Sequence, residues 1–426
     1  MTAPAPRRVP APRRAGGPPP VSPDHAAHLE HAAHLDMAYL DHAATSPLRP
    51  EACEAMAPYV GDRFGNPSGS HRLARQSRQA LDDAREEVAE LLGARPGEVV
   101  FTSGGTEADN LAVLGTLAGR VERGLEPGTV VCSAVEHAAV LEAGRAAARR
   151  SAGLLGFGPA VLRVAPVDAG GAVDVAALRE LLGPEVALVS VMLANNEVGT
   201  VQPFDAVVDA VRRLAPAAVL HTDAVQAAPW LDLSEAASGA DLVSVSAHKV
   251  GGPQGSGALV VRSGTTVGAL AQGGGQERER RSGTQNVAGA VGLAAALRAA
   301  ARDRTRDVER VAALRDVLAD GLRAAVPGTV ESVHRAGSLP GHCHVRFAGV
   351  EQEELLVLLD DGGVCASGGA ACASGALAPS HVLSAMGVAP PDARSAIRFT
   401  LGHTTTREDV LRALSVVPAA VARLRG

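Results

Sequence analysis

Aromatic residues and lysine are both scarce in this 426-residue chain. Phe, Trp and Tyr together make up 2% of the residues, and the formal net charge is -6. A chain with few rings and no excess of positive charge lacks the stacking platforms and the basic surface that nucleic-acid binding requires. The composition therefore argues against a nucleic acid as a direct ligand.

Long hydrophobic runs are also missing. No stretch is apolar for long enough to span a bilayer, and the N-terminal segment, rich in Pro, Ala and Arg, lacks the apolar core of a signal peptide. The cysteines are few, odd in number and without paired metal-ligand spacing: Cys53, Cys132, Cys343, Cys365 and Cys372. We expect a cytoplasmic protein without a membrane anchor, in which the thiols stay reduced.

Lysine occurs once, at Lys249, and arginine supplies the rest of the 40 basic residues. A guanidinium stays protonated, whereas a desolvated lysine amine can lose its proton and form a Schiff base. In a chain that uses arginine so consistently, Lys249 is a candidate for that chemistry. A surface lysine retained by chance explains the composition equally well.

The hydrophobic pattern predicts an α/β protein. Residues 1–36 show no periodic apolar face, so we expect a disordered Pro- and Arg-rich leader. From Met37 onward, short apolar runs alternate with helical patterns at 73–92 and 206–214, which predicts a mostly parallel sheet covered on both faces. The runs expected to form strands are 99–101, 130–132, 188–192, 219–220, 242–245 and 258–261.

The same pattern suggests two domains. We expect residues 37–50 to join the small domain, residues 51–297 to form the large domain, and residues 298–426 to form the small C-terminal one. A helix at about 287–301 connects them, and a strand is expected at 343–347. Gly and Ala crowd the segment 364–376, so a mobile loop carrying Cys372 is the natural interpretation. A buried filler is the usual alternative for such a cysteine.

Three features at expected strand ends fit one cofactor. Gly104, Gly105 and Thr106 form a turn into a helix, whose N-terminus attracts anions. Asp223 follows one strand and Lys249 the next, at the edge where open α/β sheets bind ligands. Taken alone, the turn is more simply a capped turn, and a helix cap explains Asp223 equally well. Together they fit the phosphate, ring nitrogen and aldehyde of pyridoxal phosphate, and His137 lies at the same expected edge.

Nine segments and the Cys372 loop resemble the cysteine desulfurases of the NifS/IscS type, in the class V branch of fold-type I pyridoxal-phosphate enzymes. The resemblance covers residues 39 to about 410. The matching segments are YLDHAATSP (39–47), GNPS (65–68), SGGTEADN (103–110), NNEVG (195–199), HTDAVQ (221–226), SAHK (246–249), GGGQER (273–278), RSGT (281–284) and IRFTLG (397–402). It implies a large domain with a seven-stranded-type sheet, a smaller α/β domain and a homodimer.

The resemblance also implies a role for each matching residue. Lys249 is expected to bind the cofactor and remove the α-proton, His137 to stack on the ring and move protons, and Cys372 to accept sulfur from L-cysteine as a persulfide. Asn66 and Arg398 are expected to hold the substrate carboxylate. The other expected cofactor contacts are Gly105, Thr106, Asn196, Asp223, Gln226, Ser246, Ala247, His248 and, toward the partner subunit, Thr284.

The resemblance leaves the sulfur acceptor open. An iron–sulfur scaffold, a sulfur carrier or a thiolation protein are the alternatives, and no metal site is expected beyond a transient iron–sulfur ligand role for Cys372. Small-for-small departures occur at Ala74, Gly105 and 369–371, where the family commonly has Gly, Ala and a second Ser. The enzymatic alternatives are a selenocysteine lyase, an aminotransferase or an epimerase. A non-catalytic scaffold is the alternative from another class, which retention of Lys249 and Cys372 opposes.

Overall fold

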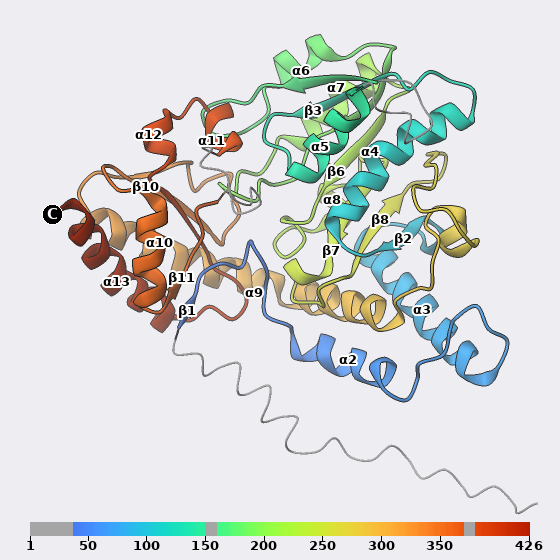
Figure 1. The fold of residues 1–426 in the computed structure, drawn as a ribbon, viewed down its shortest axis with the longest axis horizontal. Helices are drawn as coiled ribbons and strands as arrows, with labels where there is room; N and C mark the ends of the chain where they lie inside the picture. The colour runs from blue at the N-terminus through green and yellow to red at the C-terminus, as the bar shows by residue number, and fades with distance from the viewer. Residues whose placement is uncertain (1–36, 150–159, 370–379) are drawn as a thin grey trace, which may run out of the picture. The chain divides into compact units, whose positions relative to one another are not determined.

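The computed structural model describes residues 37–149, 160–369 and 380–426. The expected leader, 1–36, and the expected nucleophile, Cys372, lie outside the described residues. The central feature is a seven-stranded sheet in the order β2-β8-β7-β6-β5-β3-β4 (Figure 1). Its strands are β2 (Val99–Thr102), β3 (Thr129–Ser133), β4 (Val161–Ala165), β5 (Val186–Ser190), β6 (Val219–Asp223), β7 (Leu242–Ser246) and β8 (Gly257–Val261).

The sheet is mostly parallel, as predicted. Strands β4, β3, β5, β6 and β7 pair in parallel, whereas β8 is antiparallel to both of its neighbours, β7 and β2. Strand β4 was not expected. Only Ala165 of this strand is buried, and Arg163 interrupts the continuous apolar run that marks the buried parallel strands.

Helices cover both faces of the sheet. Alternate residues of one strand belong to different cores: Val131 packs in one hydrophobic cluster, and Val130 and Cys132 in the other. One face lies against α4 (Gly105–Glu122) and α5 (Ala138–Ala148), and the other against α3 (Arg72–Leu91) and α7 (Phe204–Leu214). Burial on both sides explains why these strands read as continuous apolar runs.

A second, antiparallel sheet has the order β12-β10-β9. Its strands are β9 (Thr329–Glu331), β10 (His342–Phe347) and β12 (Ala396–Thr400), and a separate parallel pair joins β1 (Ala38–Tyr39) to β11 (Val364–Cys365). The remaining helices are α2 (Pro50–Val60), α6 (Val175–Leu181), α8 (Leu233–Ala236), α9 (Val287–Ala325), α10 (Gln352–Asp361), α11 (His381–Ala385), α12 (Pro390–Ala393) and α13 (Arg407–Arg425). Among the described residues, no helix is long and apolar enough to cross a membrane.

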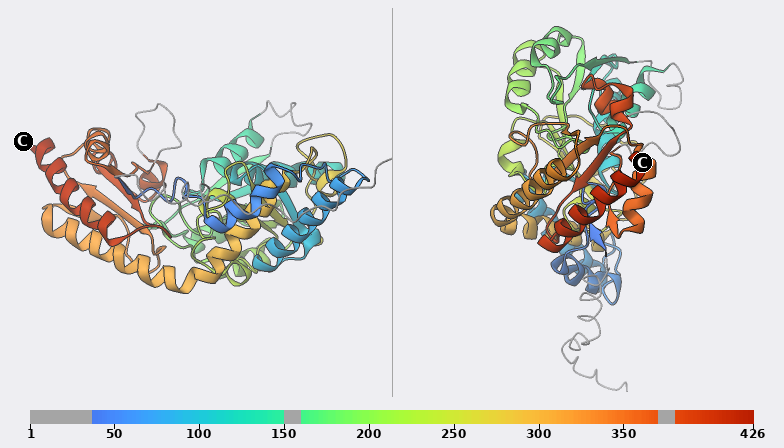
Figure 2. Two further views of the ribbon diagram at one scale, coloured as in Figure 1. Left: turned by 90° about the horizontal axis from the view of Figure 1, so that it is seen from below. Right: turned by 90° about the vertical axis from the view of Figure 1, so that its left-hand side faces the viewer.

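Helix α9 runs beneath both sheets (Figure 2) and is much longer than the expected 287–301 helix. The second half of the helix is rich in Arg and Asp, which interrupt the apolar pattern used to predict its length. Val311, Leu318 and Leu322 nevertheless continue a buried stripe. This stripe packs near α13 and β10. The expected domain boundary at 297/298 falls within α9, and the proposed division into domains stays a prediction.

A buried ion pair anchors the 273–284 segment to the rest of the chain. Glu277 receives two hydrogen bonds from the Arg85 guanidinium, at 2.7 and 2.8 Å, and one from the Phe101 backbone N–H at 3.0 Å. Burial acts to raise the pKa of Glu277, but the Arg85 contacts outweigh it and hold that pKa below its usual value. Each buried charge is matched by the other, so removing one partner leaves an uncompensated buried charge.

Glu277→Gln is therefore expected to lower the free energy of unfolding by about 3–5 kcal/mol, because Arg85 stays buried without its counter-charge. Glu142→Gln is the matched control. Its side chain is 55% exposed and pairs with Arg145 at the surface, so the change should cost less than about 1 kcal/mol. Urea titrations of the two variants measure the difference, and equal losses would contradict the role given to the buried pair.

Candidate active site

Four neighbouring parallel strands deliver polar side chains to one pocket. His137 follows β3, Asn196 follows β5, Asp223 ends β6, and Lys249 lies in the 3-10 turn Ala247–Lys249 directly after β7. All four line a cavity of about 400 Å³ at the carboxyl edge of the sheet. That volume suits a small organic cofactor with its substrate.

One end of the pocket is built to hold an anion. Gly105 and Thr106 begin α4, and Ser246 and His248 line the same pocket. A Cβ added at Gly105 would lie 3.6 Å from Ser246 Cβ, so the two residues are close neighbours. The Ser246 Oγ is buried and has no hydrogen-bond partner among the described residues. Gly104 adopts a φ of +151° and leaves open space toward that hydroxyl, since an added Cβ there would meet Ser246 Oγ only at 3.8 Å. An unpaired hydroxyl beside a helix N-terminus fits a phosphate group.

Asp223 provides a buried carboxylate to the same pocket. It is 5% exposed, and its Oδ1 accepts a hydrogen bond from the Val225 backbone N–H at 2.9 Å. Burial raises its pKa, while the nearby His137 and Lys249 act to lower it. A carboxyl in this position is stabilised as an anion by a cation in the pocket, such as a protonated ring nitrogen.

Lys249 is held in place by backbone carbonyls. Its Nζ donates to the carbonyl of Ala44 at 2.7 Å and to that of Ala43, and the Gln226 side-chain amide also donates to the Ala43 carbonyl, at 2.8 Å. The segment after β1 therefore fixes the amine directly beside Asp223 and His137 in the pocket.

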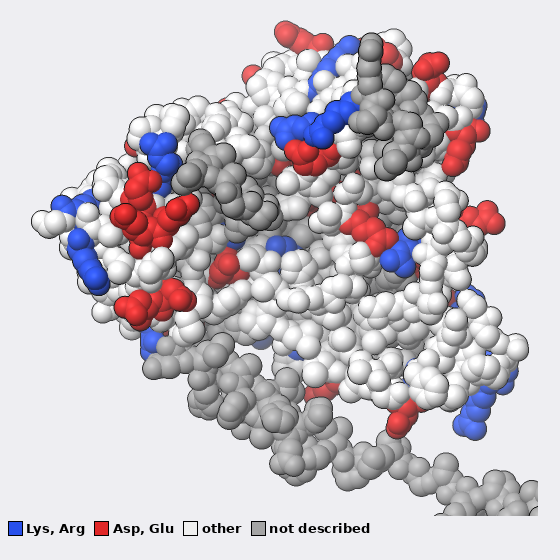
Figure 3. Space-filling view, in the orientation of Figure 1, with Lys and Arg blue, Asp and Glu red and all other residues white. Residues whose placement is uncertain are grey.

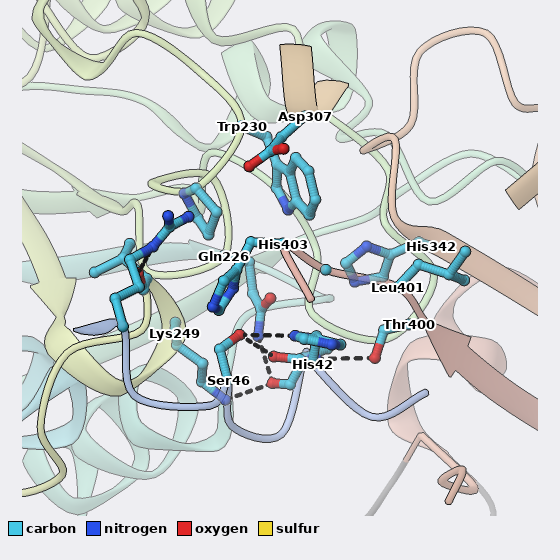
Figure 4. A pocket seen from close by; sticks show the side chains of 15 residues that line it. His42, Ser46, Gln226, Trp230, Lys249, Asp307, His342, Thr400, Leu401 and His403 are labelled. Carbon is cyan, nitrogen blue, oxygen red and sulfur yellow. Dashed lines mark hydrogen bonds between the residues drawn. The ribbon is translucent and has the colours of Figure 1, made fainter. Parts of the chain in front are cut away.

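A second cavity adjoins Lys249 and Gln226. Figure 4 shows it surrounded by His42, His342 and His403. Burial lowers the pKa of each of these histidines to about 3, so all three imidazoles are uncharged at neutral pH. The histidines thus add no positive charge next to the lysine amine.

His137 and Arg398 complete the pocket. His137 is the N-cap of α5, and its Nδ1 accepts from the Ala139 backbone N–H at 3.2 Å, which leaves the proton of a neutral ring on Nε2. Arg398, on β12, donates to the Asn196 carbonyl at 3.0 Å and pairs with Asp41 Oδ1 at 2.8 Å. Arg398 thus brings a positive charge to the wall of the pocket.

The pocket does not gather every expected residue. Ala247 is buried behind it, and Asn66 and Thr284 are exposed and do not line it within one chain. The Asn66 side chain instead accepts from the Ser68 backbone N–H at 3.0 Å. The expected roles of these three residues stay predictions, and that of Cys372 lies outside the described residues.

Several residues that line or approach the pocket were not predicted from the sequence. Asp109 lines it from the first turns of α4, and Ala43 and Asp41 approach it from the N-terminal segment. Asp109 could have been predicted, because it is a carboxyl on the helix that follows the anion turn. Ala43 contributes its backbone carbonyl, and Asp41 pairs with Arg398, which is 357 residues away. No local sequence pattern reveals either contact.

The chain is similar to known proteins over most of its length. The family model described as aminotransferase class-V matches residues 38–413. The IscS-like cysteine desulfurase of Mycobacterium tuberculosis is 44% identical over 392 residues, covering 91% of this chain and 97% of that protein.

Two known structures share the fold. A NifS-like protein superposes with a TM-score of 0.82 at 34% identity, covering 91% of this chain and all of that one. A structure described as SspA in complex with cysteine gives 0.71 at 31% identity, with 85% and 98% covered. The chain belongs to the class-V aminotransferase family. Within that family its relatives are NifS- and IscS-type cysteine desulfurases.

Gly369 is the last described residue before 370–379 and lines the pocket of this class-V enzyme. Its φ is +80°, and an added Cβ would lie 2.7 Å from Glu197 Cγ. Glu197 is itself buried, and burial raises its pKa to about 7. Position 369 therefore combines a left-handed backbone conformation with a Glu197 contact that leaves no room for a Cβ atom.

Gly387 offers a matched control, because its φ is +78° and nothing lies within 4 Å of an added Cβ. Gly387→Ala should cost about 1–2 kcal/mol of unfolding free energy, the ordinary cost of a left-handed alanine. Gly369→Ala should cost about 1–3 kcal/mol more, since Glu197 must move. Urea titration compares the two, and equal losses would show that the Glu197 contact is unimportant.

Proposed function

We propose that this chain is a pyridoxal-phosphate-dependent cysteine desulfurase. It takes the sulfur of L-cysteine, releases L-alanine and keeps the sulfur as a persulfide on Cys372. The observation that carries the proposal is the convergence of Lys249, Asp223, His137 and Arg398 on one pocket with an anion-binding end. The curated relatives named as cysteine desulfurases, which align along 91% of the chain, support the same activity.

The residues present fit pyridoxal phosphate. The unpaired Ser246 hydroxyl, His248 and the start of α4 would hold the phosphate, Asp223 the ring nitrogen, and Lys249 the aldehyde carbon. When bound, pyridoxal phosphate supplies an electron sink for the charge left when the α-proton of the substrate departs. Asp223 would keep the ring nitrogen protonated, and His137 would lie against the ring.

The chain's own groups then position and deprotonate the substrate. Arg398, oriented by Asp41 and by the Asn196 carbonyl, binds the carboxylate of cysteine. The amine of Lys249 moves the α-proton, because it lies in the same pocket and can titrate. The thiolate of Cys372 attacks the substrate sulfur: a sulfur–sulfur bond forms, the carbon–sulfur bond breaks, and the carbon fragment takes up protons to become alanine.

The partners belong to the same proposal. A homodimer is supported by the exposed position of Thr284, which the family resemblance assigns to the other subunit's phosphate. The persulfide passes to an iron–sulfur scaffold, a sulfur carrier or a thiolation protein. The face of the molecule in Figure 3 carries interspersed acidic and basic side chains. A reducing, cytoplasmic location suits a reaction that depends on a free thiolate.

Lys249→Ala and Lys249→Arg should both abolish alanine release and the visible absorbance of the bound cofactor. Arginine retains the charge but cannot bond to the aldehyde or accept the α-proton, because a guanidinium does not deprotonate. Arg213→Lys, at an exposed position on α7, should leave both properties intact. Substantial turnover by Lys249→Arg would refute the assignment of the lysine.

Cys372→Ser should still bind cysteine and change the cofactor spectrum, yet form no persulfide and release almost no alanine, since lysine chemistry precedes sulfur attack. Cys365→Ser is the control. Cys365 lies on β11, where its carbonyl accepts from the Leu40 N–H at 3.0 Å, and burial raises its thiol pKa. Mass spectrometry after a cysteine pulse locates the extra sulfur; finding it on Cys365 would overturn the proposal.

A further inference from the structure

A carboxylate lies beside the groups that are proposed to hold the phosphate. Glu107 lines a cavity of about 350 Å³ at the turn 103–106, and Thr106, Ser246 and His248 line the same cavity. An unmatched negative charge in this place would repel a phosphate. The reaction described above gives Glu107 no role, so the position of its carboxylate needs an explanation.

The cavity itself supplies no full positive charge to match Glu107. The described residues that line it include no arginine and no lysine, and their one other titratable group is His248. Burial, and then the neighbouring Lys249, lower the pKa of His248 to about 4, so this imidazole is neutral at neutral pH. The N–H groups that begin α4 contribute partial charges. A full charge that offsets Glu107 therefore has to come from a residue next to the cavity.

Arg281 supplies that charge. Its Nε donates to Glu107 Oε1 at 2.8 Å, and its Nη2 donates to Oε2 at 3.3 Å. The two side chains are 26% and 27% exposed, so water screens the pair only in part. Burial acts to raise the pKa of Glu107, but the hydrogen bonds from Arg281 and Ser103 outweigh it and lower that pKa. Glu107 is thus an anion whose charge is matched within the chain.

The same carboxylate also determines which N–H groups of the turn stay available. Glu107 is the third residue of α4, and its Oε2 accepts from the Ser103 N–H, just before the N-cap Gly104, at 2.7 Å. The first N–H groups of a helix have no acceptor within it. Glu107 therefore occupies the Ser103 donor and leaves the N–H groups of Gly105 and Thr106 for an anion.

The backbone that carries Arg281 has an unfavourable conformation. Residues 277–279 have φ values of 48°, 56° and 62°, in the left-handed region that residues with a Cβ adopt at a cost. Two contacts hold this run: Glu277 accepts from the Phe101 N–H, and Arg281 pairs with Glu107. The contacts lie on either side of the turn 103–106. A strained run that is fixed at these two points indicates a role in shaping the turn.

We propose that Arg281 is a positioning residue of the phosphate site. It matches the charge of Glu107 and holds this carboxylate against the Ser103 N–H, so that a phosphate meets the start of α4 without an unmatched negative charge beside it. The inference rests on the proposed function, which places the phosphate of pyridoxal phosphate at this turn. It extends that function by giving the 273–284 segment an electrostatic role in binding the cofactor.

Titration of the full chain, freed of cofactor, with pyridoxal phosphate tests the proposal through the cofactor absorbance. Arg281→Gln should weaken binding about three- to tenfold, because Glu107 is then unpaired beside the phosphate. Arg281→Lys retains the charge and should lose less. Pyridoxal, which has no phosphate, should bind Arg281→Gln and the wild type equally. Arg213→Gln, which removes an exposed pair with Asp209, should leave both affinities unchanged. Equal weakening for pyridoxal would overturn the proposal.

A second substitution separates charge from structure. Glu107→Gln in the Arg281→Gln background removes the negative charge and keeps an acceptor for the Ser103 N–H, so pyridoxal phosphate should bind within about twofold of the wild type. A double variant as weak as Arg281→Gln, or an Arg281→Gln variant as tight as the wild type, would refute the inference even in a working desulfurase. None of these titrations involves cysteine. A protein that shows the expected affinities but releases no alanine would refute the proposed function and leave this inference standing.

Discussion

The site depends on the parallel pairing of β3, β5, β6 and β7. Because the four strands run in the same direction, the segments that follow them begin at one edge of the sheet. Pairing of Asp223 with Ser244 fixes how far β6 and β7 extend toward that edge. A shift of one residue would turn Asp223 away from the pocket and send its neighbour Thr222 there instead. The chemistry therefore inherits its geometry from backbone hydrogen bonds in the sheet.

The sequence was most informative where burial is strong and local. Continuous apolar runs marked the strands, and the turn, Asp223 and Lys249 at their ends predicted most of the pocket. It was least informative where side chains are exposed or polar, as along β4 and in the second half of α9. Arg398 and Asp41 pair although they are 357 residues apart in the sequence, and no periodic pattern predicts such a contact. The resemblance to a family, rather than any local pattern, supplied Arg398.

The division of work between arginine and lysine follows from their chemistry. Arginine occurs where a planar, permanently charged fork meets a carboxylate, as in Arg85 with Glu277 and Arg398 with Asp41. Both guanidinium groups are almost fully buried and have their charge matched by a nearby carboxylate. The lysine occupies the place where a charge that can be lost is required. Its neighbours there include backbone carbonyls and neutral imidazoles.

The buried ionisable groups near the pocket follow the same rule, that a charge is kept only where it is matched. An isolated ion in the interior is unstable, so buried ionisable groups either pair or become neutral. His42, His221, His342 and His403 take the second course, since burial lowers the pKa of each to about 3. Their neutrality means that these four imidazoles add no charge beside the groups that line the pocket. A charged ligand entering it therefore meets the fields of Asp223, Lys249 and Arg398 without a further contribution from these histidines.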